Sequence, residues 1–250
     1  MGLLISCYWG IVIVFKLFGV LFLYRPSLYG HMLTFQNLTV IGTSHIAKDS
    51  VKKVREVILD KRPTVVALEL DAPRLKALLS GVQGKPSIRD IRRFGIKGWL
   101  FGLVGHWIEQ KLGSKVGVSP GSEMLAGFRA AGEVHAKIAL IDQDITITLR
   151  RFTLTFREIW HFFVDLFRPR SFEISGVPDA DVVCELMDEV KVRYPSIYRV
   201  LIEERNNFMA KRLARLMKSQ EHIVAVVGLG HERELVALVK KYLNKFDFVS

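Results

Sequence analysis

Short runs dominated by β-branched and aliphatic residues alternate along the chain with longer amphipathic stretches. Four of these runs are typical of buried strands that end at a turn, and they cover residues 38–41, 64–68, 136–141 and 223–227. In the stretches between them, apolar residues recur three and four positions apart, so we expect helices there. The pattern predicts a mixed α/β fold with a largely parallel sheet flanked by helices.

The predicted helices differ in how they connect the strands. The first lies between the first two strands, and this strand, helix, strand order predicts a right-handed crossover with parallel pairing of those strands. Three others form a long helical segment between the third and fourth strands, divided at Arg168-Pro169 and Tyr194-Pro195. The expected helical ranges are 49–60, from 72 onward, 123–132, 155–167, 178–190, 196–217 and from the fourth strand to about 243.

The stretch 96–112 combines large apolar residues with regularly spaced glycines. Its length is too short to cross a bilayer convincingly. We expect a helix that covers the functional site, and the alternative is a helix lying on a membrane surface.

The first 31 residues differ in composition from the rest of the chain. From Leu3 to Leu23 the sequence is almost wholly apolar, which is about the length of a membrane-spanning helix. Lys16 counts against a span, because a charge near the bilayer centre costs about 3 kcal/mol. Two interpretations remain open: membrane association through residues 3–24, or an over-extended start with Met32 as the first residue of the protein. We expect residues 32–250 to form a single α/β domain.

The net charge and the two cysteines indicate which partners, metal ligands and cellular compartment to expect. The net charge of +11 suits an anionic partner, but it is spread thinly, and no nucleic-acid signature accompanies it. We therefore expect no nucleic-acid partner. The only cysteines are Cys7 and Cys184, which fits a reducing compartment and argues against thiolate metal ligands. We expect a cytoplasmic main domain, and Arg25 after the apolar run favours the same side if that run is an anchor.

Candidate chemistry gathers where the predicted strands end. Two strands each run into a Gly-x-x-His turn, one ending at His45 and the other at His231, and Glu69 and Asp142 follow two further strands. Glu123 lies just after a Pro-Gly turn. In open α/β sheets, ligands bind outside the carboxyl ends of the strands, so these side chains can share one crevice.

Two imidazoles and a carboxylate form a common ligand set for a divalent metal ion and leave positions for water and substrate. A metal bound by His45, Glu69 and His231 would lower the pKa of a bound water to about 7, and a second carboxylate would act as general base. A histidine after a strand is also a common hydrogen-bonding residue, so a structural polar network remains an alternative.

Six blocks of the sequence, taken in order, resemble the TraB family, which is named for proteins that shut down sex-pheromone signalling. This family is similar to the Tiki metalloproteases and more distantly to erythromycin-esterase-like hydrolases. The resemblance implies a mixed α/β fold with His45, Glu69 and His231 in the active centre, and with Glu123, Asp142 and Arg205 as supporting residues. The blocks are Gly42-Thr-Ser-His45, Val65-Val-Ala-Leu-Glu-Leu-Asp-Ala-Pro-Arg74, Pro120-Gly-Ser-Glu123, Leu140-Ile-Asp-Gln-Asp-Ile-Thr-Ile-Thr-Leu-Arg-Arg151, Glu204-Arg-Asn-Asn-Phe-Met-Ala210 and Val227-Gly-Leu-Gly-His231.

The sequence departs from the family pattern at one position near the expected site. The family usually has Asp-Arg-Asp after the third strand, whereas this chain has Gln143 in the middle position, so a positive charge is missing there.

Our leading hypothesis is a metal-dependent hydrolase that acts on a peptide or similar small substrate. His45, Glu69 and His231 would hold the metal, with Glu123 as base or orienting residue and Arg205 stabilising negative charge. The alternative is a non-catalytic protein that binds a peptide or other ligand and sequesters a signal.

Overall fold

The sheet has five strands in the order β1-β2-β5-β3-β4. The computed structural model describes residues 32–43, 48–81, 91–92, 95–96, 99, 121–151, 155–167, 180–219 and 221–247. β1 (Met32–Phe35) runs antiparallel to β2 (Leu38–Thr43), and all other neighbours are parallel. The remaining strands are β3 (Val65–Leu68), β4 (Lys137–Leu140) and β5 (Ile223–Gly228). The expected mixed, largely parallel α/β fold is confirmed.

Two features of the sheet differ from the prediction. β1 was not predicted, and a turn at Gln36, with a φ of 52°, joins it to β2 as a hairpin. The predicted pairing of the first two long strands is wrong, because β5 lies between β2 and β3. β2 and β5, the two strands that run into the Gly-x-x-His turns, are therefore direct neighbours. Thr43 of β2 lies opposite Gly228 of β5, and its Oγ1 donates to the carbonyl of Val227 at 3.1 Å.

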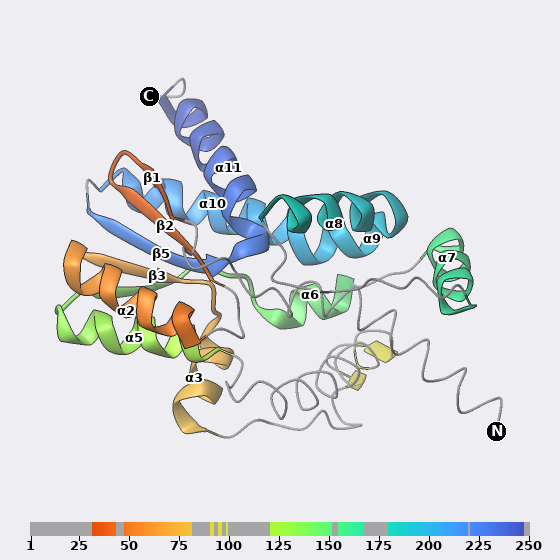
Figure 1. Cartoon of the computed structure of the whole chain (residues 1–250), viewed down its shortest axis with the longest axis horizontal. Coiled ribbons are helices and arrows are strands. Elements are labelled where there is room, and N and C mark those ends of the chain that lie inside the picture. Colours follow the sequence, from red (N-terminus) through yellow and green to blue (C-terminus); the bar gives the residue numbers. More distant parts are fainter. Residues whose placement is uncertain are drawn as a thin grey trace.

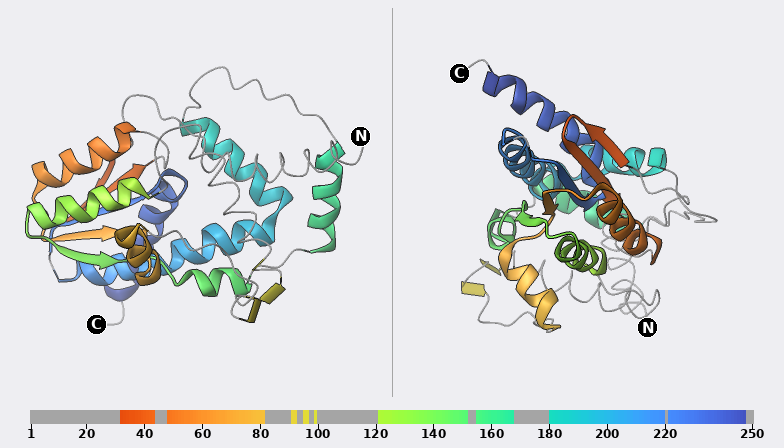
Figure 2. Two further views of the ribbon diagram at one scale, coloured as in Figure 1. Left: turned by 90° about the horizontal axis from the view of Figure 1, so that it is seen from below. Right: turned by 90° about the vertical axis from the view of Figure 1, so that its left-hand side faces the viewer.

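Helices cover both faces of this sheet (Figures 1 and 2). On one face, α2 (Lys48–Lys61) and α5 (Ser122–Glu133) pack on side chains such as Ile41 and Val226. On the other, α10 (Glu204–Met217) and α11 (Leu229–Asp247) pack on the alternate residues of the same strands, such as Val40 and Ala225. Successive side chains of a strand point to opposite faces, so these fully buried apolar strands form the centre of two cores.

The remaining helices form the expected long helical segment and the rim of the sheet. Three of them are α7 (Phe156–Phe167), α8 (Ala180–Arg193) and α9 (Pro195–Tyr198), and a π-helical turn (Arg199–Glu203) joins α9 to α10. α3 (Ala72–Ser80) follows β3, and α6 (Ile145–Arg151), which was not predicted, follows β4.

Two expected segments lie outside the described residues. One is the N-terminal run within 1–31, and the other is the helix expected at 96–112, of which the structure describes only Ile96 and Trp99. In the part of the chain that is described, no helix has the length and apolar character needed to cross a bilayer.

Gly42 of β2 is packed too closely for a larger residue. A β-carbon at this position would collide with Oε2 of Glu232 and would lie 2.9 Å from Cδ1 of Leu229. We expect Gly42→Ala to lower the free energy of unfolding by about 1 kcal/mol, the low end of the cost of overpacking a core, because the atoms in the way are the ends of two side chains that can shift. Urea denaturation measures this change. Gly132→Ala is the matched control, since nothing lies within 4 Å of its β-carbon and it is helical, so it should cause no loss. Equal stability of the two variants would contradict the close approach.

Candidate functional site

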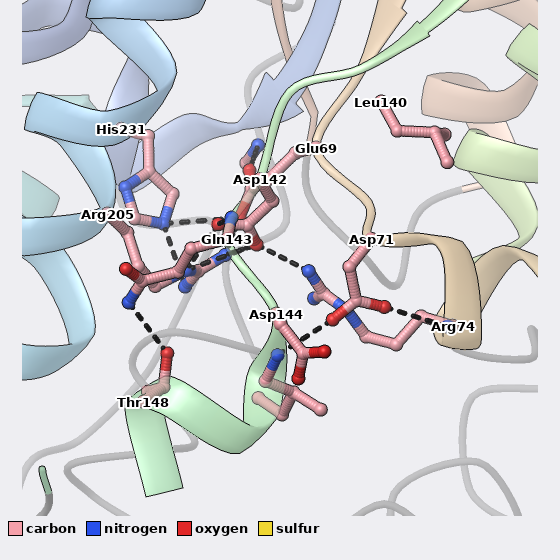
Figure 3. A network of polar contacts seen from close by, with 12 residues as sticks. Glu69, Asp71, Arg74, Leu140, Asp142, Gln143, Asp144, Thr148, Arg205 and His231 are labelled. Carbon is pink, nitrogen blue, oxygen red and sulfur yellow. Dashed lines mark hydrogen bonds and ion pairs between the residues drawn. The ribbon is translucent and has the colours of Figure 1, made fainter. Parts of the chain in front are cut away.

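The carboxyl ends of β3, β4 and β5 bring three of the expected site residues together (Figure 3). Glu69 directly follows β3, Asp142 lies two residues after β4, and His231 lies in the first turn of α11 after β5. All three are nearly buried, at 6%, 3% and 5% exposure. The parallel strands end at one edge, so residues far apart in the sequence meet there.

Arg205 of α10 lies at the centre of this group. Its Nη2 donates to Oε1 of Glu69 and, at 2.7 Å, to Oδ2 of Asp142, while its Nε lies 3.1 and 3.2 Å from the two oxygens of Asp142. Its Nη1 donates to the carbonyl of Leu201 in the π-helical turn at 3.2 Å and lies 3.4 Å from Nε2 of His231. The guanidinium therefore connects the ends of all three strands.

A second guanidinium belongs to Arg74 of α3. Its Nη2 donates to Oδ2 of Asp142 at 2.5 Å, and its Nε lies 3.3 Å from Oδ2 of Asp71. Asp71 also caps α3 by accepting from the Arg74 amide at 2.8 Å. A positive charge thus reaches Asp142 from α3, although Gln143 stands where the family usually has arginine. The Gln143 side chain instead donates to Thr148 at 2.8 Å.

Both oxygens of Glu69 have partners. Oε2 accepts from the amide of Gly228 at 2.7 Å, and Oε1 faces Arg205 and lies 3.3 Å from Nε2 of His231. The amide of Glu69 itself donates to the carbonyl of Val226 at 3.1 Å. This carboxylate is therefore held to β5 at both its backbone and its side chain.

A chain of hydrogen bonds fixes the orientation of His231. Its Nδ1 lies 2.6 Å from Oδ1 of Asn206, and Nδ2 of Asn206 donates to Oε2 of Glu234 at 2.8 Å. The carboxylate of Glu234 can only accept, so the amide of Asn206 is oriented with its oxygen toward the imidazole. Nδ1 must then carry a proton, so that Nε2, which faces Glu69 and Arg205, is the basic nitrogen whenever the imidazole is neutral.

The charges of this cluster depend on one another. Burial raises the pKa of Asp142, but the charge and hydrogen bonds of Arg205, followed by those of Arg74, bring it well below its usual value. Burial likewise lowers the pKa of Arg205, while Asp142 and Glu69 raise it above its usual value. The two groups therefore stay ionised together, and each stabilises the charge of the other.

In the described part of the chain, a guanidinium lies beside Glu69 and His231, two of the three predicted metal ligands. An ion bound to Glu69 and His231 would meet the guanidinium of Arg205, which already occupies the space beside both of them. Among the described residues, no group of three histidine, cysteine or acidic side chains is placed to hold a metal. The predicted ligand His45 lies outside the described residues, so the metal site stays a prediction.

The supporting role of Glu123 also stays a prediction. This side chain lies in the first turn of α5 and is 1% exposed. A buried acid there agrees with the expected role, and the helix dipole favours the same position.

Sequence reasoning missed Arg74 and Asn206. Asn206 is 0% exposed and lies on the same buried face of α10 as Met209, Ala210 and Leu213. A polar residue in line with the apolar face of a predicted helix was therefore the signal that could have identified it. Arg74 follows the helix-capping Asp71 by three residues, but nothing local indicates that it reaches Asp142.

Glu232, next to His231, is a buried acid whose Oε1 has no hydrogen-bond partner in the described part of the chain. Burial raises the pKa of Glu232 to about 7, although Arg233 and Lys53 act in the opposite direction.

The raised pKa of Glu232 predicts a pH-dependent gain in stability for Glu232→Gln. The folded state binds the proton more tightly than the unfolded state, so the stability that this group contributes is complete below its ordinary pKa of 4.5 and is lost as pH rises to about 7. We expect Glu232→Gln to raise the free energy of unfolding by about 1–2 kcal/mol at alkaline pH and to leave it unchanged in acid. Urea titrations across this pH range measure the difference, and a constant offset would contradict the assignment.

Comparisons with known proteins identify the family to which this chain is similar. The family model described as TraB/PrgY/gumN family matches residues 33–241. An uncharacterized protein, MJ1365, of Methanocaldococcus jannaschii is 33% identical over 223 residues, which cover 84% of this chain and 55% of that protein. TraB domain-containing proteins of Bos taurus and Homo sapiens are each 23% identical, over 77% of this chain and 59% and 60% of their own lengths.

This chain thus spans between half and two thirds of the length of these relatives. The expected likeness to Tiki proteins and to erythromycin-esterase-like hydrolases stays a prediction. The match of the family model over most of the chain, together with the archaeal relative, shows that this protein belongs to the TraB/PrgY/gumN family.

Proposed function

We propose that the site at the ends of β3, β4 and β5 is the catalytic centre of a hydrolase that acts on a peptide or similar substrate. The observation that supports this most strongly is the hydrogen bond from His231 to Asn206, which holds a proton on Nδ1 and makes Nε2, beside Glu69 and Arg205, the basic nitrogen of the neutral imidazole. An imidazole held in one tautomer by a second residue is the usual arrangement of an acid–base catalyst.

In the proposed reaction, His231 transfers one proton in two steps. As the oxygen of a water molecule bonds to the substrate carbonyl carbon, Nε2 takes one of the water protons. His231 then gives this proton to the leaving nitrogen as the carbon–nitrogen bond breaks, which restores the neutral imidazole. Glu69 stabilises the imidazolium between the steps, because its Oε1 lies 3.3 Å from Nε2.

Arg205 acts in this proposal as a positioning residue. Each of its three guanidinium nitrogens already has a partner, so it has little capacity to bind a substrate oxygen directly. Its contacts hold Glu69 and Asp142 in place, and its positive charge lowers the pKa of Asp142. The expectation that Arg205 stabilises charge on the substrate would require its Nη1 to turn away from Leu201 or His231.

Asn206→Leu tests the orientation of His231. The isosteric side chain removes the acceptor for the Nδ1 proton, so we expect kcat to fall by about 10–100-fold with little change in KM, as is typical when a supporting hydrogen bond is lost. Nitrogen NMR shifts of the imidazole should also show the other tautomer gaining population. Glu234→Gln is the matched control, because a glutamine oxygen still accepts from Asn206 and activity should be kept. Equal kinetics in the two variants would contradict the role given to Asn206.

The metal expectation is tested separately, because no step above depends on a metal. If His45, Glu69 and His231 hold an ion, the purified protein should contain it, and His45→Ala and His231→Ala should each lose it. Elemental analysis of the three proteins measures this content directly. Equal and negligible metal in all three would contradict the metal expectation and leave the acid–base proposal standing.

A further inference from the structure

The start of α7 is attached to the rest of the molecule by a buried acid. Glu158 is 0% exposed, and its Oε1 accepts from the amide of Ser196 at 2.6 Å, at the beginning of α9. Its Oε2 accepts from the amide and hydroxyl of Thr155, both at 2.7 Å. The side chain of Arg157 donates to the carbonyl of Val192 in α8 at 3.3 Å. These bonds fix the rotation of the first turns of α7 about the helix axis, with Arg157 and Glu158 on the side that contacts α8 and α9.

The opposite side of these turns carries unshielded aromatic residues. Phe156 is 92% exposed and Trp160 is 68% exposed, and their spacing of four residues puts them on one face of the helix. Val192, at the Arg157 contact, is 70% exposed. Figures 1 and 2 show α7 standing away from the sheet and its covering helices. Large aromatic side chains gain free energy when they leave water, so this face is suited to a partner.

The charges around α7 favour an anionic partner. The sequence from Arg150 to Arg170 contains five arginines and two acidic residues. One of those acids is the buried Glu158, and one of the arginines, Arg151, pairs with Glu204 at 3.0 Å, so the segment keeps an excess of positive charge. A helix with aromatic residues on one face, in a segment of the sequence that is rich in arginine, is typical of helices that lie in a membrane interface. Aromatic rings lie at the depth of the lipid headgroups, and each arginine near an anionic surface contributes about 1 kcal/mol.

We propose that α7 is a membrane-surface helix, with Phe156 and Trp160 entering the headgroup region of an anionic bilayer. Pairing of this face with a second copy is disfavoured, because it would bring two positively charged segments together. The proposal is independent of the hydrolase proposal, since α7 carries none of the groups that act on the substrate. In this proposal α7 lies along the surface of the bilayer and does not span it.

The test uses the full chain with Trp9, Trp99 and Trp107 replaced by phenylalanine, so that Trp160 is the only tryptophan. We expect vesicles of phosphatidylcholine and phosphatidylglycerol to shift its emission to shorter wavelength. Lipids brominated near the headgroup should quench it, and high salt should reverse both effects. Trp160 that stays fully accessible to acrylamide with these vesicles would overturn the proposal. A shift that needs no vesicles and grows with protein concentration would also overturn it and indicate a second copy.

A second measurement keeps the wild-type tryptophans and compares vesicle affinities. Replacing Phe156 and Trp160 with serine should weaken binding to the anionic vesicles by about tenfold or more, because both rings lose their burial. Leu79→Ser is the control, since Leu79 is 52% exposed on α3 and is not part of this face. Unchanged affinity of the double variant would overturn the proposal.

Discussion

Arg205→Met is expected to lower the free energy of unfolding by about 3–5 kcal/mol at neutral pH, the usual cost of leaving buried charges without their partner. Glu69 and Asp142 are 6% and 3% exposed and share this guanidinium. Methionine fills much of the same volume, so the loss reports the uncompensated carboxylates more than a cavity. Urea denaturation gives the value. Arg215→Met is the matched control on the exposed side of α10 and should change stability by less than about 0.5 kcal/mol.

The stability deficit of Arg205→Met should depend on pH in a defined direction. In the wild type, burial raises the pKa of Asp142, but Arg205 and Arg74 lower it further, to below its ordinary value. The stability that the ion pair contributes is therefore present above the unfolded pKa of about 3.9 and is lost as pH falls through the folded value. The deficit of the variant should shrink in acid, where its carboxyls become neutral. A deficit that is small at neutral pH, or constant with pH, would contradict the pairing.

His231→Gln is expected to lower kcat by about 10²–10⁴-fold, the usual contribution of an acid–base residue. Glutamine can still form hydrogen bonds in this position, but it cannot take a proton at neutral pH, so the loss should be in chemistry more than in folding. We expect the melting temperature to stay near that of the wild type. Steady-state kinetics and thermal unfolding of one preparation measure both effects.

His222→Gln is the matched control for that substitution. His222 lies directly before β5, at the opposite end of the strand from His231, so this variant should keep full activity. Loss of stability without loss of activity in His231→Gln would indicate that the histidine belongs to a structural network.

Strand ends carried most of the information that the sequence held about the site. Apolar runs marked β3, β4 and β5, and the polar residues directly after them were Glu69 and Asp142, with His231 in the next turn. Parallel strands place such residues at one edge, so their meeting could be predicted without knowing the strand order.

The strand order itself could not be predicted in this way. β2, β3 and β5 are buried along their whole length and lie in the middle of the sheet, so no pattern of buried and exposed faces distinguishes their neighbours. β5 is the last strand in the sequence, and yet it lies between β2 and β3. β1 was missed because it is a short edge strand with mostly exposed side chains.

The central position of Arg205 depends on geometry that local patterns do not show. The π-helical turn before α10 shifts the helix register, and its Leu201 carbonyl accepts from Arg205. Arg74 reaches the same carboxylate from α3, which is far away in the sequence. The sequence could therefore indicate which residues belong to the site but not that two guanidiniums fill its centre.

Product analysis in heavy-oxygen water tests the central claim most directly. Wild-type protein and His231→Gln are incubated with a peptide library, and mass spectrometry follows the new carboxylates. Hydrolysis at this site predicts that heavy oxygen enters the carboxylate of each cleaved peptide with the wild type and falls by at least about 100-fold with the variant. Saturable peptide binding by the wild type with no labelled product would contradict catalysis and indicate a protein that sequesters its ligand.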